Sequence, residues 1–290
     1  MDLTVVIVSY NVSSLLRQCL KTVSRARQGI TSEIYVVDNN STDGSCSVVR
    51  QEFPDVCLIE NSANIGFSAA NNQALRLAKG RYILLLNPDT LIEENALSQC
   101  IGFMESHQDA GALGVKMVNG EGKYLPESKR CLPNVSSAFF KSFGLSFIFP
   151  GSTLFNRYYL AEVGMDETAK TGVISGAFMF IRRETLEKTG LLDEDYFMYG
   201  EDVDLSYRIL EAGYHNYYFP QVKVVHFKGC STSRQNYDDI ANFYKAMRIY
   251  FTKRVSEGKF RFWSLLIIPG IYLREFMALL NRFLKIKLKR

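Results

Sequence analysis

The sequence lacks the features that mark disulfide-stapled, secreted or nucleic-acid-binding proteins. Its six cysteines are scattered and show no Cys-x-x-Cys spacing, which favours reduced, buried thiols and a cytoplasmic location. A net charge of +4, concentrated at the C-terminal end, is too small to predict binding to nucleic acid. No signal-peptide pattern precedes the first apolar run, at Leu3 to Val8, and no internal repeat or low-complexity tract occurs. These absences favour one large α/β domain with a tail.

The sequence also lacks an uninterrupted run of about 20 apolar residues, the length that a transmembrane helix needs. The best candidate begins at Phe260 and is broken by Pro269 and by later charges. The chain then ends in a basic cluster made of Lys285, Lys287, Lys289 and Arg290. We therefore expect residues 236–290 to be helical, amphipathic and basic, and to lie on the inner surface of the plasma membrane. Docking of this segment on the main domain, or on a second copy in a homodimer, is the alternative.

What the sequence contains instead is a series of apolar runs that lead into helical patterns. Three such units begin at Leu3, Glu33 and Val56. Strands that alternate with helices about every 25 residues predict a doubly wound, mostly parallel sheet flanked by helices. Ligands bind beyond the carboxyl ends of such strands. The residues that follow these strand ends include Ser9, Tyr10, Asn11, Asp38, Asn64 and Gly66.

A fourth apolar run, Leu84 to Leu86, continues into Asn87, Pro88 and Asp89. Uniformly apolar strands are typical of buried parallel sheets. A carboxylate at the end of such a strand can bind Mg²⁺ or Mn²⁺ that also bridges substrate phosphates. By itself, Asp89 also fits the role of N-cap to a helix that the sequence predicts from Leu91.

The second half of the chain adds a small-residue bend and a pair of acids. Ser175 and Gly176 precede a predicted strand, and Gly176 also fits a purely structural bend. Glu201 and Asp202 fall in the first turn of a helix predicted to start near Gly200, where the helix dipole favours charged carboxylates. A charged carboxylate is what a general base requires. Capping of the helix is the alternative role for Asp202.

A histidine, His226, directly follows a third candidate segment, the predicted strand Lys223 to Val225. A neutral imidazole there can bind a metal, and a charged one can contact phosphate. Hydrogen bonding of the ring to the backbone is the alternative. The other two histidines, His107 and His215, have no comparable context.

Five segments taken in order carry a resemblance to a known family. They are Val6–Asn11, Val37–Asp43, Asn64–Phe67, Asn87–Asp89 and Glu201–Asp204. This order resembles that of family 2 glycosyltransferases, which have the GT-A fold. The chain looks most similar to the bacterial rhamnosyltransferase-like branch, which builds cell-surface polysaccharides. The resemblance covers about residues 3 to 235, and five ordered motifs are far more specific than any one of them.

The resemblance implies a role for each candidate residue. Those expected to bind the donor nucleotide and its sugar are Ser9, Tyr10, Asn11, Asp38, Asn64, Gly66, Asn87, Ser175 and Gly176. Asp89 and His226 would hold Mg²⁺ or Mn²⁺. Many members have Asp-x-Asp where this chain has Asn87-Pro88-Asp89, so one carboxylate is available and metal affinity would depend on the bound diphosphate. Asp202 would be the general base, and Glu201 would orient the acceptor or support Asp202.

The resemblance also implies a division of the chain. Residues 1–235 would form the GT-A catalytic domain, with a nucleotide-binding half at 1–118 and an acceptor and catalytic half at 119–235. Acceptor specificity is expected in residues 119–170, around the apolar run Val135 to Phe149. A hydrophobic flap that only shields the donor from water is the alternative for that run.

The implied activity is inverting, metal-dependent transfer of a sugar from dTDP-rhamnose or a UDP-sugar. The acceptor would be a hydroxyl of a cell-surface glycan or of a lipid-linked intermediate. One alternative is an inert scaffold in a polysaccharide assembly complex, against which the retention of Asp89, Glu201 and Asp202 argues. Another is a sugar nucleotidyltransferase, which would need a glycine-rich basic loop where this chain has Ser9 to Ser13.

Overall fold

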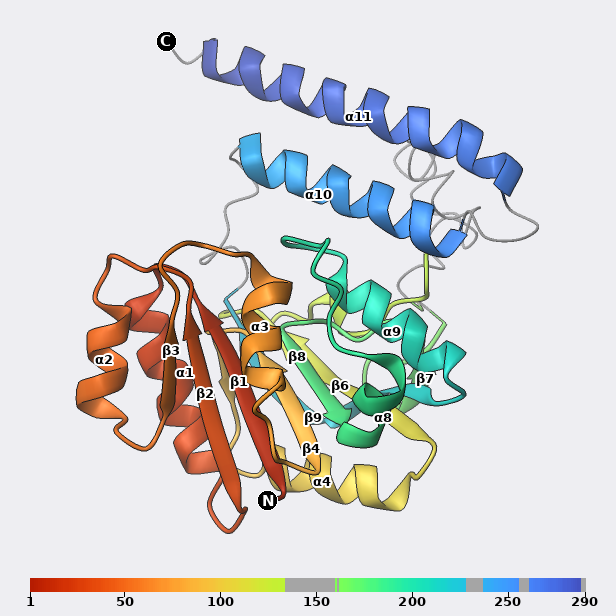
Figure 1. The fold of residues 1–290 in the computed structure, drawn as a ribbon. Coiled ribbons are helices and arrows are strands. Elements are labelled where there is room, and N and C mark those ends of the chain that lie inside the picture. Colours follow the sequence, from red (N-terminus) through yellow and green to blue (C-terminus); the bar gives the residue numbers. More distant parts are fainter. Residues whose placement is uncertain (134–159, 161, 228–236, 256–260, 288–290) are drawn as a thin grey trace.

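A mixed β-sheet with helices on both faces organises the chain (Figure 1). The computed structural model describes residues 1–133, 160, 162–227, 237–255 and 261–287. Within these residues the 9-stranded sheet has the order β3-β2-β1-β4-β8-β6-β9-β5, and β7 also pairs with β9. The strands are β1 (Leu3–Ser9), β2 (Ser32–Asp38), β3 (Cys57–Glu60), β4 (Tyr82–Leu86), β5 (Thr90–Ile92), β6 (Ala110–Val118), β7 (Ala169–Thr171), β8 (Phe178–Arg182) and β9 (His215–His226).

Helices connect these strands and form the C-terminal segment. The helices are α1 (Ser13–Ala26), α2 (Ser45–Glu52), α3 (Phe67–Leu75), α4 (Ala96–Ser106), α8 (Arg183–Thr189), α9 (Glu201–Glu211), α10 (Tyr237–Tyr250) and α11 (Arg261–Lys287). Two shorter turns complete the description, the 3₁₀ turn η1 (Pro126–Ser128) and the π-helical turn η3 (Phe251–Val255).

Strand direction divides the sheet into two halves. Strands β3, β2, β1 and β4 run parallel to one another, as the repeated βα units predict. Beyond β4 the sheet is mixed, because β8 is antiparallel to both β4 and β6 while β6 and β9 are parallel. The predicted α/β fold is confirmed, and its parallel pairing is concentrated in the N-terminal half.

Alternation along the strands gives the sheet two apolar faces. In β1, Leu3, Val5 and Ile7 pack with residues of α1, α2 and α4, whereas Val6 and Val8 pack with α3, α8 and α9. Successive strand side chains point to opposite faces, so a strand that is apolar at every position must be covered on both sides. The two helical layers provide that cover and hold the strand ends in fixed positions.

One predicted element is wrong, and the correction bears on the site. Residues 90–92 form strand β5, whereas the sequence predicted a helix from Leu91. The helix α4 begins only at Ala96, and β5 pairs antiparallel with β9, with Thr90 opposite His226. This pairing fixes Asp89 beside the end of β9, so Asp89 is not the N-cap of α4, whose N-cap is Asn95.

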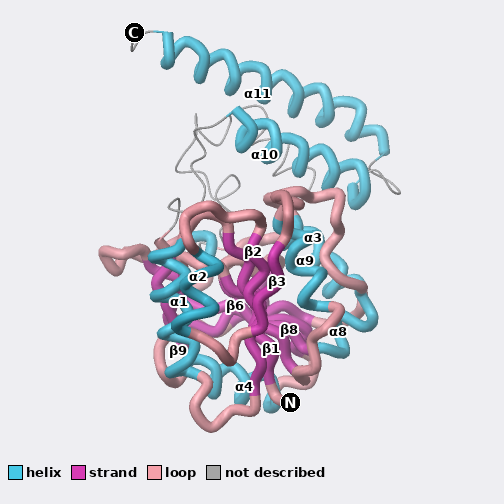
Figure 2. The backbone as a smooth tube through the Cα atoms, turned by 60° about the vertical axis from the view of Figure 1, so that its left-hand side comes forward, coloured by secondary structure: helices cyan, strands magenta, loops and turns pink. Residues whose placement is uncertain are grey.

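The C-terminal segment packs through one face on residues between 173 and 203. Ala246, Tyr250 and Phe251 join Val173 and Tyr196 in a third apolar cluster, which also contains Val203, Ile267 and Ile271. Figures 1 and 2 show α10 and α11 beyond the end of the sheet that is opposite the N-terminus. Among the described helices, none combines the length and apolarity required to cross a bilayer.

Two sequence predictions fall partly outside the described residues. The apolar run Val135 to Phe149 lies in the segment 134–159, which the structure does not describe. Of the cysteines, Cys19, Cys46, Cys57, Cys100 and Cys131 are free thiols, and Cys230 lies outside the described residues.

Candidate active site

The residues predicted from strand ends converge on one edge of the sheet. Ser9 and Asp38 are register partners at the ends of β1 and β2, and Leu86 at the end of β4 is level with Ile7. Because β8 is antiparallel to β4, its first residue, Phe178, lies opposite Leu86 at the same edge. The carboxyl ends of three parallel strands and the entry to β8 therefore meet in one place, where ligands bind in open α/β sheets.

Two buried oxygens at this edge have unused hydrogen-bonding capacity. Ser9 is fully buried and Asp38 is 2% exposed. Within the described residues, Ser9 Oγ and Asp38 Oδ1 have no hydrogen-bond partner, whereas Asp38 Oδ2 accepts from the Ser41 amide at 2.7 Å. A buried polar atom without a partner costs about 1–3 kcal/mol, so two of them side by side indicate a ligand that would bond them.

Tyr10 and Asn11 follow β1 at this edge of the sheet and have different surroundings. Tyr10 is 45% exposed, so its ring is available to a ligand. Asn11 adopts a left-handed backbone with φ of 53°, and its amide donates to Ser41 Oγ at 2.9 Å. Its Oδ1 accepts from the Thr42 amide at 2.8 Å, which joins the loops after β1 and β2. Asn11 therefore holds the two loops together, and its side-chain oxygen is already used in that contact.

Asn64 and Gly66 place the next loop against Phe197. Asn64 Oδ1 accepts from the Gly66 amide at 3.0 Å, and Gly66 has φ of 88°. A Cβ at Gly66 would lie 2.6 Å from the carbonyl oxygen of Phe197, and the amide of Phe67 donates to that same oxygen. Glycine is thus required here by conformation and by close approach. Nothing in the sequence indicated that Gly66 would contact Phe197.

Asp89 and His226 lie side by side at the same edge. Asp89 is 1% exposed, and its Oδ1 lies 3.3 Å from His226 Nε2. The amide of Phe227 donates to the Asp89 carbonyl at 2.9 Å, which fixes the two strand ends. Among the described residues, His226 Nδ1 is buried without a hydrogen-bond partner. The structure therefore brings together the two residues that the sequence predicted as metal ligands.

The segment 175–177 connects this edge to the acids of α9. The amide of Asn87 donates to the carbonyl of Ala177 at 3.1 Å, and the amide of Gly176 donates to Asp202 Oδ2 at 3.3 Å. A Cβ at Gly176 would make only ordinary contacts, the nearest being with Asp202 and Glu201 at 3.6 Å. A strained bend therefore does not explain why position 176 is glycine. Gly176 lies next to the side chains of both Glu201 and Asp202.

Asp202 is held by a cation that sequence reasoning did not assign to it. Arg130 Nη2 lies 2.6 Å from Asp202 Oδ2, and each side chain is 14% exposed. Asp202 Oδ1 accepts from the Val203 amide at 2.8 Å. Arg130 is positioned by pairing of its backbone with Val173. The guanidinium of Arg130 and the amides of Gly176 and Val203 therefore fix the orientation of the Asp202 carboxylate.

Glu201 has the opposite surroundings. It is 7% exposed, and within the described residues its Oε2 has no hydrogen-bond partner. Burial, and next the neighbouring Asp202 carboxylate, raise the pKa of Glu201 to about 8. A helix N-terminus favours a carboxylate by only about 0.3–1 kcal/mol, whereas burying a charge costs several kcal/mol. Burial therefore outweighs the dipole, and Glu201 is neutral near pH 7, not charged as its place in the first turn predicted.

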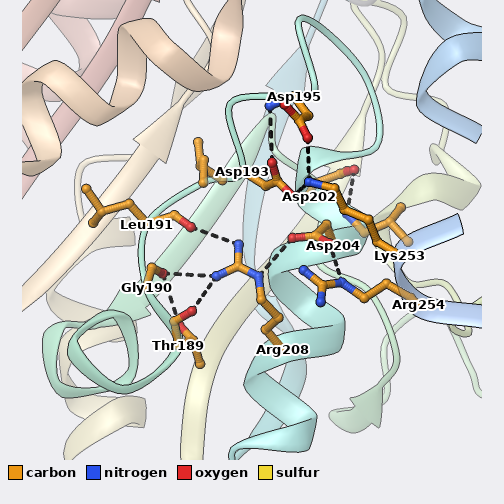
Figure 3. A network of polar contacts seen from close by, with 12 residues as sticks. Thr189, Gly190, Leu191, Asp193, Asp195, Asp202, Asp204, Arg208, Lys253 and Arg254 are labelled. Carbon is orange, nitrogen blue, oxygen red and sulfur yellow. Dashed lines mark hydrogen bonds and ion pairs between the residues drawn. The ribbon is translucent and has the colours of Figure 1, made fainter. Parts of the chain in front are cut away.

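The third acid of α9, Asp204, anchors the helix (Figure 3). Asp204 is fully buried and pairs with Arg208 at 2.8 Å and with Arg254 of η3 at 2.7 Å. Arg208 also donates to the carbonyl of Leu191 at 2.8 Å. Next to Arg254, Lys253 lies 2.6 Å from both Asp193 and Asp195. The C-terminal segment thus holds the loop before α9 through Lys253 and holds α9 itself through Arg254.

The α9 start is held in an unusual backbone conformation. Tyr199 and Gly200 both have positive φ, at 68° and 84°. A Cβ at Gly200 would lie 3.0 Å from the Tyr196 ring and 3.3 Å from Ala246 of α10. A left-handed backbone at a non-glycine residue such as Tyr199 is costly and persists where surrounding contacts hold it, commonly at functional sites. Here the contacts come from Tyr196 and from the C-terminal segment.

Comparison with solved structures defines the class of protein. The chain shares the GT-A glycosyltransferase fold with a mannosyltransferase from Pyrobaculum calidifontis solved with GDP-Man and Mn²⁺. The TM-score is 0.61 at 23% identity, and the match covers 97% of this chain and 72% of that one. GT-A glycosyltransferases typically use a divalent metal.

Comparison of sequences defines the family. Residues 4–190 match the family model described as Glycosyl transferase family 2, and the chain belongs to that family. It is 29% identical over 265 residues to the N-acetylglucosaminyl-diphospho-decaprenol L-rhamnosyltransferase of Mycobacterium tuberculosis, covering 88% of this chain and 85% of the relative. It is 29% identical over 191 residues to the rhamnosyltransferase WbbL of Escherichia coli, covering 63% and 66%. The predicted family and its rhamnosyltransferase-like branch are confirmed, and the chain is a hexosyl-transferring glycosyltransferase.

Proposed function

We propose that the chain transfers a hexose from a nucleotide diphosphate donor to an acceptor hydroxyl with inversion, and that Asp202 is the general base. The observation that carries this proposal is the segment 175–177, which hydrogen-bonds to Asn87 on one side and to Asp202 on the other. Donor edge and base are thereby parts of one site. Residues 1–235 act as the catalytic domain in this proposal, with the donor half at 1–118 and the acceptor half at 119–235.

The donor nucleotide binds along the ends of β1 and β2. Ser9 Oγ and Asp38 Oδ1 take up hydrogen bonds from the base or ribose, which supplies the partners that these buried atoms lack within the described residues. Tyr10 contacts the nucleotide face, and the Asn11 and Gly66 loops shape the pocket. Asn87, Ser175 and Gly176 line the path of the diphosphate and sugar. The rhamnosyltransferase relatives favour dTDP-rhamnose as the donor, with a UDP-sugar as the second candidate.

Asp89 and His226 are the proposed ligands of Mg²⁺ or Mn²⁺. A carboxylate oxygen and an imidazole nitrogen 3.3 Å apart suit a shared cation. No cluster of three or more potential metal-binding side chains occurs in the described residues, so most ligands would come from the diphosphate and water. When bound, the metal would stabilise the negative charge of the departing nucleoside diphosphate.

The chain's own residues carry the proton transfer. The acceptor oxygen forms a bond to the anomeric carbon, the bond from that carbon to the diphosphate breaks, and the hydroxyl proton passes to Asp202. Arg130 pairs with Asp202 at 2.6 Å and orients its carboxylate, so Arg130 is a positioning residue. Glu201, neutral and beside Asp202, donates a hydrogen bond to the acceptor or to its neighbour. General-base catalysis of this kind contributes about 10²–10⁴-fold.

The acceptor is proposed to be a glycan or a lipid-linked intermediate, presented at a membrane surface that the C-terminal segment contacts. The relatives named above include an enzyme whose acceptor is a diphospho-decaprenol lipid. The exposed apolar side chains of α11 support contact with lipid.

A thermal-stability panel tests the donor part of the proposal. The full chain is heated with UDP, dTDP, GDP and their sugars, with and without Mg²⁺ or Mn²⁺, beside Asp89→Ala. A ligand at 100 times its dissociation constant stabilises by about 2.7 kcal/mol, so one nucleotide should raise the melting temperature with metal. The shift should disappear in Asp89→Ala and persist in Glu93→Ala, a nearby exposed acid. Absence of any nucleotide shift would instead favour the inert scaffold.

A further inference from the structure

Helix α11 exposes a continuous apolar face. Phe276 is 63% exposed and Leu273 and Met277 are each 60% exposed. At about 100° per residue, the exposed apolar residues from 272 to 284 fall within one arc of about 140°. We call this face the apolar arc; its members are Tyr272, Leu273, Phe276, Met277, Leu280, Phe283 and Leu284.

The opposite face of α11 is fixed to the protein. Ile267 and Ile271 are fully buried in the third apolar cluster, and Glu275 pairs with Arg248 of α10. Arg248 also stacks on the Tyr272 ring, 4.4 Å from its centroid. The helix is therefore docked by one side, and docking leaves the apolar arc in solvent. Contiguous exposed apolar surface of this kind marks an interaction site.

Charge identifies the partner. From Phe276 onward the sequence contains five cations and no carboxylate, and these five exceed the net charge of +4 of the whole chain. The cations are Arg282, Lys285, Lys287, Lys289 and Arg290. A cavity of about 260 Å³ between α10 and α11 adds Lys245, which is exposed, beside the paired Arg248 and Lys253. Apolar side chains next to clustered cations suit a bilayer that carries anionic headgroups.

The position of α11 relates this face to the site. Figures 1 and 2 both show α10 and α11 beyond the carboxyl ends of β1 and β2. The candidate site lies at that same edge, and η3 connects to the loop before Asp202 through Lys253 and to α9 through Arg254. A surface that binds α11 would therefore lie on the side of the molecule where the acceptor must enter.

We propose that the apolar arc of α11 lies in the headgroup region of an anionic phospholipid bilayer, with the site facing the membrane. This inference rests on the proposed function for its consequence, which is that the acceptor is lipid-linked and reaches Asp202 from the bilayer surface. A second copy of the chain is the competing occupant of the arc. A second copy would bring the same cations against those of the first. The one acidic residue in the described α11, Glu275, is already paired with Arg248 and is not available to them.

The test is flotation of the full chain with vesicles of phosphatidylcholine alone or with about one third phosphatidylglycerol. We expect at least about tenfold stronger binding to the anionic vesicles. Replacing two residues of the arc, Phe276→Glu with Leu280→Glu, should weaken that binding at least about tenfold. Leu77→Glu is the matched control, because Leu77 is a 52% exposed leucine outside the arc. Melting curves confirm that each variant is folded.

Each outcome bears on the proposal separately from the donor assignment. Binding that is lost in the arc variant and kept in Leu77→Glu supports it. No vesicle binding, equal binding by the arc variant, or a dimer in light scattering that the arc variant abolishes would overturn it. The nucleotide thermal shift is measured on the same samples. Its absence in the unsubstituted chain would overturn the proposed function while leaving the vesicle result to stand by itself.

Discussion

At the scale of single residues, two adjacent carboxylates have opposite environments. Asp202 has a guanidinium at 2.6 Å and two backbone amides, whereas burial keeps Glu201 neutral by raising its pKa to about 8. Pairs of acids whose surroundings differ in this way commonly divide the acid and base roles of an active site. This difference supports the proposal that Asp202 is the base.

The raised pKa of Glu201 makes stability depend on pH. The folded chain holds the Glu201 proton from the ordinary value of 4.5 up to about 8, so the free energy of unfolding falls as pH rises through that window. Glu201→Gln should match the unsubstituted chain near about pH 5 and melt several degrees higher near about pH 9.

Differential scanning calorimetry at both pH values measures this difference. Glu184→Gln, which removes an exposed glutamate from the first turn of α8, is the control for loss of a carboxylate. Equal pH dependence in Glu201→Gln and the unsubstituted chain would show that Glu201 is ionised in the fold.

Sequence reasoning found the residues at strand ends because position along the chain defines them. Ser9, Asp38 and Asp89 each follow an apolar run, and the structure brings them to one edge. Arg130 could not be assigned, because it meets Asp202 across 72 residues and nothing local to it indicates a partner. Its position follows from backbone contacts with a distant segment, because the Arg130 carbonyl accepts from the amides of Gly172 and Val173.

At the scale of elements, the geometry of the site depends on a short segment whose local sequence fits either a helix or a strand. Residues 90–92 have the pattern of a helix start, yet they pair with β9 as strand β5. The outcome depends on a partner more than 120 residues away, which no local propensity contains. The same pairing brings His226 to Asp89, so the wrongly predicted element and the contact between these two residues have one cause.

The loop at Gly66 provides a test at this scale. Gly66→Ala places a Cβ 2.6 Å from the Phe197 carbonyl oxygen at φ of 88°, and it should cost about 2–4 kcal/mol of unfolding free energy. Gly122→Ala has φ of 80° with nothing within 4 Å, and it should cost only about 1–2 kcal/mol. Urea denaturation of both variants separates close contact from backbone strain, and equal losses would contradict the contact with Phe197.

At the scale of the whole molecule, the C-terminal segment is both docked and exposed. The sequence left a choice between a membrane-surface helix and a helix packed on the domain. The structure shows packing through Ile267 and Ile271 and leaves Phe276 exposed on the same helix. Hydropathy alone could not distinguish the buried face of α11 from its exposed face. Which face is buried depends on contacts with Tyr196 and Val203, which lie far away in the sequence.

The ion pairs of η3 test how strongly this segment supports α9. Arg254→Gln leaves the fully buried Asp204 with Arg208 alone, and it should lower the unfolding free energy by about 1–3 kcal/mol. Arg17→Gln is the matched control, because its pair with Glu52 is 41% and 36% exposed and should contribute less than about 1 kcal/mol. Similar losses in both variants, measured by urea denaturation, would show that Arg254 does not anchor the helix.

The central claim is that one site joins a nucleotide-sugar edge to the base Asp202. The most direct measurement is release of nucleoside diphosphate by the full chain with donor, metal and acceptor, compared between the unsubstituted chain and Asp202→Asn. We expect kcat to fall about 10²–10⁴-fold in Asp202→Asn while the nucleotide thermal shift is unchanged. Full turnover by Asp202→Asn, with its fold and donor binding intact, would contradict the assignment and return the search for the base to the other acids of the cleft.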